Sequence, residues 1–280
     1  MRILVTGHMG YIGSKLFETL SDGINIVHGI DLKGGKDVLC DLPDESYDYV
    51  FHLAALPRVL NSIEEPSRTF KNNAYATSVL LEWSKNHNVK RFIFSSSSAV
   101  VGSHGEPNSP YGLHKFISEQ ECKLYSKLYG LDTVCLRYFN VYSPEQPYGG
   151  SYSTAICAWR QMIKDGKPLR IDGDGEQTRD FVHLKDVVSA NIFCMKHTEN
   201  FNGLIFDVGS GESCSLNHIK SIISQYHDVK WVFAPERDGD VKHTKSNIEP
   251  LKEIGWTPTV KIDDGISSCF KDLTKNQYIL

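Results

Sequence analysis

Residues 3–13 read ILVTGHMGYIG and place three glycines, Gly7, Gly10 and Gly13, at intervals of three. The apolar run before the glycines is typical of a buried strand, and the stretch after them has the apolar spacing of a helix. Glycines at this spacing let the backbone turn tightly, let a pyrophosphate approach the main chain, and let the helix pack close to the strand. The helix N-terminus then offers unpaired N–H groups to phosphates. The segment therefore predicts a dinucleotide-binding turn.

An acidic residue stands at the place where such a turn needs one. Asp31 ends the next predicted strand, 18 residues beyond Gly13. A carboxylate there accepts hydrogen bonds from both ribose hydroxyls and repels a 2′-phosphate, so NAD is favoured over NADP. A glycine-rich turn with a capping aspartate is the alternative, and the combination of strand, helix and acid disfavours it. Asp41 and Leu42 end a further short segment and are candidates to contact the adenine amine. A solvated turn explains Asp41 nearly as well.

The rest of the chain alternates short apolar runs with amphipathic stretches. This alternation predicts a parallel sheet flanked by helices, and hence an α/β fold. We expect strands at Ile3–Val5, Ile26–Gly29, Tyr49–Leu53, Arg91–Phe94, Thr133–Arg137 and Leu204–Val208, and helices at Tyr11–Leu20, Pro66–Asn86 and Pro110–Tyr129. The segment from Pro144 to about Arg179 has weaker periodicity. From Ser213 onward, two helical stretches and a Pro/Gly-rich region at 250–260 indicate a smaller second lobe.

Composition excludes several classes of protein. The 280 residues are 40% apolar, and Lys+Arg total 30 against 34 Asp+Glu, for a formal charge of −4. We expect no nucleic-acid partner, because a basic excess is absent. We expect no membrane association, because no charge-free stretch reaches the ~18–20 residues of a membrane helix. The N-terminus shows no secretory pattern, and the seven cysteines have no metal-type spacing. These features predict a cytoplasmic protein with reduced thiols and no metal site.

Tyr111 and Lys115 are the first catalytic candidates. They lie four apart in a predicted helix with Ser109 as N-cap and Pro110 at its first position, so both side chains share one face. A tyrosine with a pKa of ~10 is a poor base at neutral pH. An ammonium beside it, together with a nicotinium ring, favours the phenolate. Such pairs are common by chance, and this one gains weight from the nucleotide-binding half that precedes it.

Four serines, 95–98, directly follow the predicted Arg91–Phe94 strand. In a doubly wound sheet the carboxyl ends of the strands face the ligand crevice. One hydroxyl is therefore a candidate to hydrogen-bond the substrate oxygen that loses its proton. A flexible polar loop is the alternative.

Several of these segments, in this order, resemble the extended short-chain dehydrogenase/reductases, in particular the NAD-dependent epimerase/dehydratase family. The matching stretches are TGHMGYIG (6–13), HLAA (52–55), SSSSAVVG (95–102), YGLHK (111–115) and LRYFNVY (136–142). GDGEQTRDFVH (173–183) and PERDGD (235–240) resemble its nucleotide-sugar branch. The resemblance implies a Rossmann-type doubly wound parallel sheet with a smaller C-terminal substrate lobe. The NAD-binding domain would span residues 1–143 and continue through about 180–212; the substrate lobe would comprise 144–179 and 213–280.

The resemblance also implies roles for individual residues. Tyr111 would be the base and acid, Lys115 would hold the ribose and tune Tyr111, and Ser97 would be the hydroxyl partner. Matches to NAD contacts are Gly7, Met9, Gly10, Tyr11, Ile12, Gly13, Asp31, Asp41, Leu42, Leu53, Ala54, Ala55, Ser95, Tyr111, Lys115 and Tyr138. Matches to substrate contacts are Ser97, Asn140, the two diphosphate arginines Arg179 and Arg237, and Thr244. The family usually forms a homodimer through two helices of each subunit.

The residues after Ser97 narrow the expected reaction. Family dehydratases and decarboxylases carry an acid there, and C3/C5 epimerases carry a cysteine, whereas this chain has Ser98 and Ala99. The chain therefore resembles the UDP-hexose 4-epimerases, which invert C4 through a transient 4-keto sugar. In these 4-epimerases the position that matches Thr244 borders the sugar 2-substituent, so the resemblance, with a small residue here, implies acceptance of UDP-GlcNAc/UDP-GalNAc alongside UDP-Glc/UDP-Gal. The alternatives are a UDP-glucuronate 4-epimerase, an NAD-dependent nucleotide-sugar 4-ketoreductase or dehydrogenase, and, more remotely, a non-catalytic NAD-binding regulator.

Some features depart from the family pattern. The segment between Gly102 and Tyr111 is shorter than usual, so we expect a more open site or a different lid. The stretch from Asp31 to Asp41 is also short, and we expect it to lack a full helix. Val101 and Ser143 replace the usual Tyr and Gly.

Overall fold

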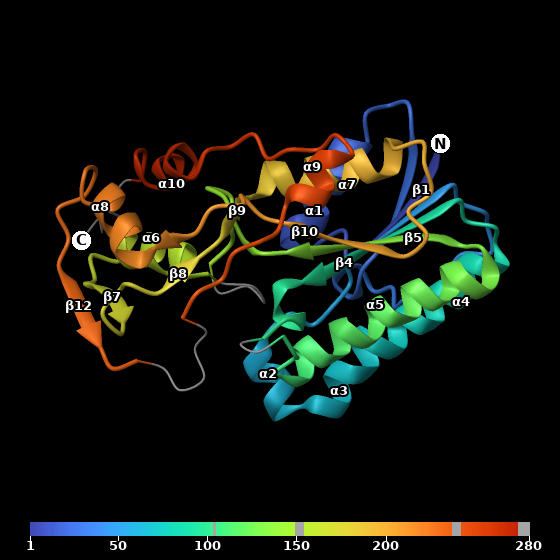
Figure 1. Cartoon of the computed structure of the whole chain (residues 1–280), viewed down its shortest axis with the longest axis horizontal. Coiled ribbons are helices and arrows are strands. Elements are labelled where there is room, and N and C mark those ends of the chain that lie inside the picture. Colours follow the sequence, from blue (N-terminus) through green and yellow to red (C-terminus); the bar gives the residue numbers. More distant parts are fainter. Residues whose placement is uncertain (103–104, 149–153, 237–241, 274–280) are drawn as a thin grey trace. The chain divides into compact units, whose positions relative to one another are not determined.

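The structure is a computed structural model that describes residues 1–102, 105–148, 154–236 and 242–273 (Figure 1). The chain divides into two compact units. The first comprises Met1–Tyr138 and Val188–Val208, and the second comprises Phe139–Val187 and Gly209–Leu280.

The first unit is built on a six-stranded sheet with the order β10-β5-β4-β3-β1-β2. Its strands are β1 (Arg2–Thr6), β2 (Ile26–Ile30), β3 (Tyr49–His52), β4 (Arg91–Ser97), β5 (Asp132–Tyr138) and β10 (Leu204–Val208). Every pair is parallel. The order reverses between β1 and β3, as in doubly wound sheets. The predicted α/β fold is therefore confirmed, with β4 continuing three residues further than its apolar run.

Helices cover both faces of this sheet. In Figure 1, α1 (Tyr11–Leu20) and α7 (Leu184–Lys196) lie on one face, and α3 (Pro66–Phe70), α4 (Ala76–Asn86) and α5 (Pro110–Tyr129) lie on the other. The short α2 (Val59–Glu64) precedes α3. Covering both faces explains why Ile3, Leu4 and Val5 are all fully buried.

The helix ends show which sequence signals were correct. Ser109 caps α5 by accepting a hydrogen bond from the Gly112 N–H, and Gly130 ends it in the left-handed conformation. The predicted bounds of α1 and α5 are confirmed. The single helix expected over Pro66–Asn86 is wrong in one respect, because a π-helical turn, Lys71–Tyr75, separates α3 from α4.

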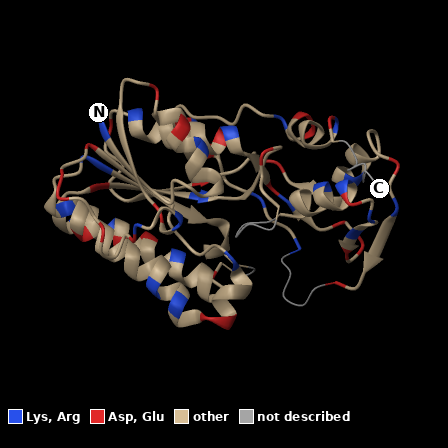
Figure 2. Ribbon diagram, turned by 180° about the vertical axis from the view of Figure 1, so that it is seen from behind, with Lys and Arg blue, Asp and Glu red and all other residues tan. Residues whose placement is uncertain are grey.

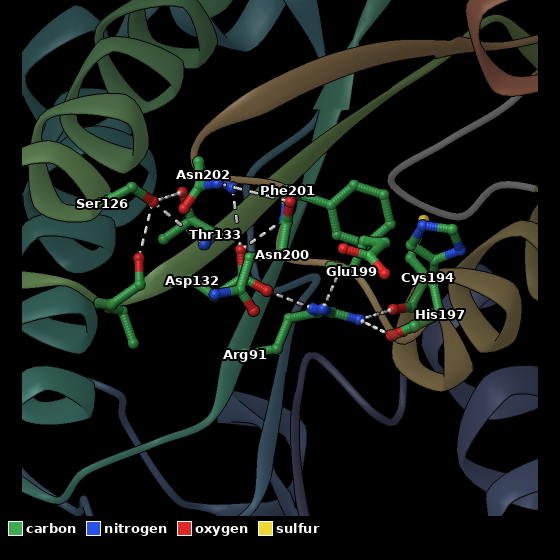
Figure 3. A network of polar contacts seen from close by, with 11 residues as sticks. Arg91, Ser126, Asp132, Thr133, Cys194, His197, Glu199, Asn200, Phe201 and Asn202 are labelled. Carbon is green, nitrogen blue, oxygen red and sulfur yellow. Dashed lines mark hydrogen bonds and ion pairs between the residues drawn. The ribbon is translucent and has the colours of Figure 1, made fainter. Parts of the chain in front are cut away.

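A buried ion pair fixes the amino-terminal ends of two central strands (Figure 3). Arg91 begins β4 and Asp132 begins β5; their Nε and Oδ2 atoms are 2.5 Å apart, and both side chains are nearly inaccessible. The Arg91 guanidinium also donates to the carbonyl oxygens of Cys194, His197 and Glu199, at 2.6–2.7 Å. The other Asp132 oxygen accepts from the N–H groups of Phe201 and Asn202. This pair therefore caps the end of α7 and holds the loop that leads into β10.

Within its described residues, the second unit contains three two-stranded pairings. They join β6 (Asn140–Tyr142) to β9 (Phe181–His183), β7 (Leu169–Asp172) to β12 (Trp231–Ala234), and β8 (Thr178–Arg179) to β11 (Cys214–Ser215). Its helices, beside the first residues of α7, are α6 (Ala155–Lys164), α8 (Leu216–Ile223), α9 (Glu249–Glu253) and α10 (Ile262–Phe270). A separate apolar core includes Trp159, Ile219 and Phe270.

Two helices of this unit were not predicted. α6 lies in the segment of weak periodicity, yet it buries Ile156, Trp159 and Ile163 on one face. α9 overlaps the start of the Pro/Gly-rich region, so three helices, rather than two, follow Ser213 within the described residues. Pro250 stands in the first turn of α9, where proline is compatible with a helix.

No helix in the described ranges is long and apolar enough to cross a membrane. Figure 2 shows Lys and Arg interspersed with Asp and Glu along the helices of the first unit.

Candidate functional site

The glycine turn forms a cradle that side chains would fill. Gly7 has a φ of +74°, and a Cβ on it would lie 2.7 Å from the Ala54 nitrogen. A Cβ on Gly13 would lie 2.1 Å from the Gly7 carbonyl oxygen. The turn, the start of α1 and the segment after β3 therefore meet backbone to backbone. This geometry fits a dinucleotide, because a pyrophosphate needs bare main chain beside a helix N-terminus.

Asp31 lies beside this turn, at the end of β2. Its Oδ2 accepts from the Met9 N–H at 2.9 Å, and its Oδ1 accepts from the Lys33 N–H at 2.9 Å. The stretch that follows contains one 3₁₀ turn, Leu32–Gly34, in place of a full helix, as expected. The carboxylate is thus positioned at the turn, and its contact with a ribose stays a prediction.

Asp41 and Leu42 have local contacts of their own. The Asp41 carboxylate accepts from the Asp37 N–H at 2.7 Å and so closes a turn. Leu42 packs against the apolar core of the first unit. These contacts are those of the solvated-turn alternative for Asp41, and the adenine contact stays a prediction.

A chain of buried hydrogen bonds supports the segment Leu53–Ala55. The Ala54 N–H donates to the Thr6 hydroxyl, which lies 2.7 Å from His52 Nδ1. His52 Nε2 is 3.0 Å from the Thr77 hydroxyl, which donates to the Asn73 carbonyl. Because the Thr77 hydroxyl already donates its proton to that carbonyl, it accepts from His52 Nε2, and His52 accepts at Nδ1. Burial lowers the pKa of His52 to about 3, so the ring stays neutral.

Sequence reasoning missed this chain and the residue that completes it. The Asn73 amide clamps the Leu56 main chain, accepting from its N–H at 2.8 Å and donating to its carbonyl at 3.1 Å. Asn73 lies in the π-helical turn, a feature that often marks functional segments. The one signal in the sequence was His52 inside the HLAA match.

The structure brings Ser97, Tyr111 and Lys115 together in the first unit. Ser97 ends β4 and hydrogen-bonds the phenol of Tyr111 on the first turn of α5. The Lys115 Nζ donates to the Ser95 carbonyl at 2.7 Å and lies 4.6 Å from the centre of the Phe94 ring. Tyr111 is 8% exposed and Lys115 is 4% exposed. A phenol, a serine hydroxyl and a lysine amine thus come together at the end of β4 and the start of α5.

Burial sets the protonation of this group. It raises the pKa of Tyr111 to about 12, and the hydrogen bond from Ser97 opposes the rise. It lowers the pKa of Lys115 to about 8, and the nearby Glu119 carboxylate opposes the fall. Desolvation therefore works against both charged forms that the predicted chemistry needs. The base needs added positive charge beside the phenol.

Ser95 and Tyr138, two predicted NAD contacts, bond each other. Their hydroxyl oxygens are 2.9 Å apart, and Asn191 on α7 donates to the Tyr138 oxygen at 2.8 Å. Burial raises the pKa of Tyr138 to about 12. Both hydroxyls are neutral hydrogen-bonding groups at neutral pH, and their contact with NAD stays a prediction.

Three of the predicted substrate residues gather around β8 and β9 in the second unit. The Asn140 backbone N–H and side-chain amide both donate to the Asp180 carbonyl, at 3.1 and 2.8 Å. Arg179 donates to the Lys242 carbonyl at 3.2 Å. The Thr244 hydroxyl accepts from the Asp180 N–H at 3.3 Å. Arg237 lies outside the described residues.

Asp180 is a further residue that the sequence did not single out. It is fully buried, and its carboxylate accepts from the N–H and hydroxyl groups of both Ser210 and Ser246 and from the Gly211 N–H. It therefore ties three separate segments of the second unit together beside Arg179.

Comparison with known proteins decides the family. Residues 3–209 match the model of the NAD dependent epimerase/dehydratase family. The chain belongs to this family. It is therefore an NAD-dependent enzyme of the epimerase type, and the resemblance noted from the sequence is confirmed.

Named members of the epimerase family cover nearly the whole chain. A putative UDP-glucose 4-epimerase of Methanocaldococcus jannaschii is 32% identical over 94% of this chain and 95% of its own length. A UDP-N-acetylglucosamine 4-epimerase from Methanobrevibacter ruminantium, in complex with UDP-N-acetylmuramic acid, has 34% identity and a TM-score of 0.88, with 96% of both chains covered. A UDP-glucuronic acid 4-epimerase from Bacillus cereus, in complex with UDP-glucuronic acid and NAD, has 31% identity and a TM-score of 0.85, covering 96% of this chain and 97% of that one.

Proposed function

We propose that the protein is an NAD-dependent nucleotide-sugar 4-epimerase that inverts C4 of a UDP-hexose. The observation that carries the proposal is the juxtaposition of Ser97, Tyr111 and Lys115 in the unit that also holds the glycine cradle. The two similar solved structures are named as 4-epimerases of UDP-sugars, which supports the same reaction.

In this proposal each residue of the trio has one task. Tyr111 takes the proton from the sugar 4-hydroxyl and later returns it, and Ser97 hydrogen-bonds the same oxygen. Lys115 holds positive charge near the phenol. NAD, when bound, supplies a hydride acceptor for C4 and a positive charge that favours the phenolate. General acid–base assistance of this kind is typically worth ~10²–10⁴-fold.

The proposed cofactor contacts extend along the switch point of the sheet. They comprise the turn and the start of α1 (Gly7, Met9, Gly10, Tyr11, Ile12, Gly13), the ends of β2 and β3 (Asp31, Leu53, Ala54, Ala55), the turn residues Asp41 and Leu42, and Ser95 and Tyr138. Because epimerisation has no net oxidation, NAD should copurify and need no replenishment. A ketoreductase or dehydrogenase would instead exchange its cofactor in each cycle.

The proposed substrate contacts other than Ser97 belong to the second unit. Asn140, Arg179 and Arg237 would hold the diphosphate, for which the fork of a guanidinium is well suited. Thr244 would border the sugar 2-substituent, and its small size favours N-acetylated sugars alongside UDP-Glc and UDP-Gal. UDP-glucuronate is a second candidate, because the Bacillus cereus relative is named for that substrate.

The outer helices support a homodimer. On α5, Leu113, Phe116, Leu124 and Leu128 are all more than a third exposed, although they are large and apolar. Their spacing is close to the turn of a helix, so they form one stripe. Phe70 and Tyr75, on the neighbouring α3 and π-helical turn, are also exposed. We propose that a second copy of the chain covers this stripe.

The thiols favour a reducing compartment. All seven cysteines are free, and six of them are buried. We propose a cytoplasmic enzyme on this ground.

Proton NMR of purified protein with UDP-GlcNAc, UDP-Glc or UDP-glucuronate, and no added cofactor, tests the function. Appearance of the matching galacto-configured sugar is the expected result, and it names the substrate. The Tyr111→Phe variant should lose ~10²-fold or more of the rate while it retains bound NAD. No change in any of the three sugars, with NAD present in the protein, would contradict a 4-epimerase of these substrates. Full turnover by the variant would contradict the base assignment.

A further inference from the structure

Burial disfavours the charged form of Lys115, and the contacts that its ammonium makes, to an aromatic ring face and a carbonyl, are with neutral groups. Its side chain is 4% exposed, lies over the Phe94 ring and makes one hydrogen bond, to the neutral Ser95 carbonyl. An ammonium in such surroundings tends to lose its proton. Something in the interior must therefore favour the cation if Lys115 is to act as one.

Glu119 lies one helical turn beyond Lys115 on the same face of α5, and it is fully buried. Its Oε1 accepts from the Ser96 hydroxyl at 2.6 Å and from Arg137 Nε at 2.8 Å. Its Oε2 accepts from Arg137 at 2.7 Å. Arg137 thus grips both oxygens of the carboxylate in a two-pronged, charge-assisted contact.

Apart from Arg137, whose guanidinium is paired with the Glu119 carboxylate, the other titratable groups facing Lys115 are uncharged at neutral pH. His52 on β3 is neutral, as argued above, and burial raises the pKa of the Cys135 thiol on β5 well above its ordinary value. Tyr111 and Cys122 lie on α5 itself, and Tyr111 is a protonated phenol at neutral pH. Glu119 is thus the group whose charge favours the ammonium.

We infer that Glu119 is a positioning residue that keeps Lys115 protonated in the apolar interior of the first unit. The carboxylate also bonds Ser96, which lies between the Ser95 carbonyl that Lys115 contacts and the Ser97 hydroxyl. It therefore links the end of β4 to the Tyr111–Lys115 face of α5. The inference rests on the proposed function in so far as Lys115 serves Tyr111.

The first test is the pH dependence of turnover. If charged Lys115 is required, its deprotonation sets the alkaline limb of the profile. Glu119→Gln keeps the shape and removes the charge, and it should move that limb down by about one pH unit. Glu119→Asp keeps the charge and should leave the limb close to that of the wild type, even if the protein is less stable.

Glu121→Gln is the matched control on the same helix. Glu121 is also partly buried and accepts a serine hydroxyl, from Ser78, but burial rather than a cation dominates its surroundings. Its substitution should leave the alkaline limb unchanged. An E119Q limb that coincides with those of wild type and E121Q would overturn the inference.

The second test needs no turnover, so it separates this inference from the proposed function. The folded pKa of Lys115 lies below its unfolded value, so the unfolded state binds more protons between the two and stability rises with pH there. E119Q should widen that gap. The loss of unfolding free energy that E119Q causes, measured by urea denaturation, should therefore be smaller at pH 10 than at pH 7. An equal loss at both pH values would show a purely structural role and refute the inference.

The Lys115→Met background tests whether the pH-dependent effect of E119Q acts through Lys115. With the ammonium gone, E119Q should lose its pH-dependent effect. If E119Q alone yields no folded protein, its recovery in this background supports the inference, and continued failure to fold contradicts it.

Discussion

At the scale of single residues, burial fixes the protonation of three histidines. His52, His114 and His183 are 1%, 5% and 6% exposed. Burial is the largest influence on each, and it lowers the pKa of all three rings. His114 Nδ1 is buried and has no hydrogen-bond partner within the described structure. The three imidazoles are therefore neutral in the folded protein at pH 7.

These histidines should make the fold sensitive to acid. Below the unfolded pKa of ~6.5 the unfolded chain binds more protons than the folded one, so stability falls as pH falls. Each histidine contributes up to about 1.4 kcal/mol per pH unit. Urea denaturation at pH 7, 6 and 5 should show the loss, and His114→Met should reduce its slope by one histidine's share. An unchanged slope in H114M would refute the account.

The site residues that could be predicted from the sequence are those that lie in contiguous motifs. Gly7, Gly13, Tyr111 and Lys115 were found because each sits in a short pattern with its own physical meaning. Asp180 was missed because its partners, Ser210 and Ser246, are far away in the sequence. The same holds for the chain through His52. Hydrogen bonds over such separations exist only once the fold is formed.

At the scale of elements, the ends of β4, β5 and α7 depend on one buried cation. Arg91 satisfies Asp132 and three carbonyl oxygens at the end of α7 and in the loop after it. Its guanidinium also lies 4.6 Å from the centre of the Phe201 ring. Removing it would leave a buried carboxylate and several acceptors without partners.

Arg91→Met should therefore destabilise the protein by about 3–5 kcal/mol, the usual cost of breaking a buried ion pair from one side. The measurement is urea denaturation at neutral pH. Arg170→Met is the control, because the Arg170–Asp172 pair is 2.6 Å long but Arg170 is more than half exposed. Its loss should cost no more than about 1 kcal/mol. Similar losses in both variants would contradict the role of burial.

Elements were predicted well where caps and periodicity agreed. Ser109 and Pro110 mark the start of α5, and the predicted bounds of the helix agree with the structure. The break between α3 and α4 was not predicted because the π-helical turn, Lys71–Tyr75, contains no proline or glycine to signal it. α6 was missed because its short apolar face is flanked by the irregular segment from Pro144.

At the scale of the whole molecule, the apolar stripe on α5 concerns association. Burying a leucine or phenylalanine side chain is worth ~1.5–3 kcal/mol, so four exposed on one helix face favour a partner. A second copy of the chain would present the same stripe, and a two-fold interface pairs like surfaces.

Sedimentation equilibrium should therefore report twice the chain mass of 31.5 kDa, that is 2 × 31.5 = 63 kDa. Leu124→Glu places a charge in the stripe and should shift the protein toward the monomer. Leu204→Glu is the matched control, since Leu204 is equally exposed on β10, outside the stripe. A wild-type protein that sediments as a monomer would refute the proposed dimer.

Because one thiol is exposed and six are buried, the reactivity of the native cysteines can report unfolding. Cys40 is exposed in the folded chain and the six other cysteines are buried. A maleimide dye added to the native protein should attach at this one position, in the turn that Asp41 closes. Denaturation uncovers the rest, so a thiol-counting reagent reads the opening of each core without any engineered probe.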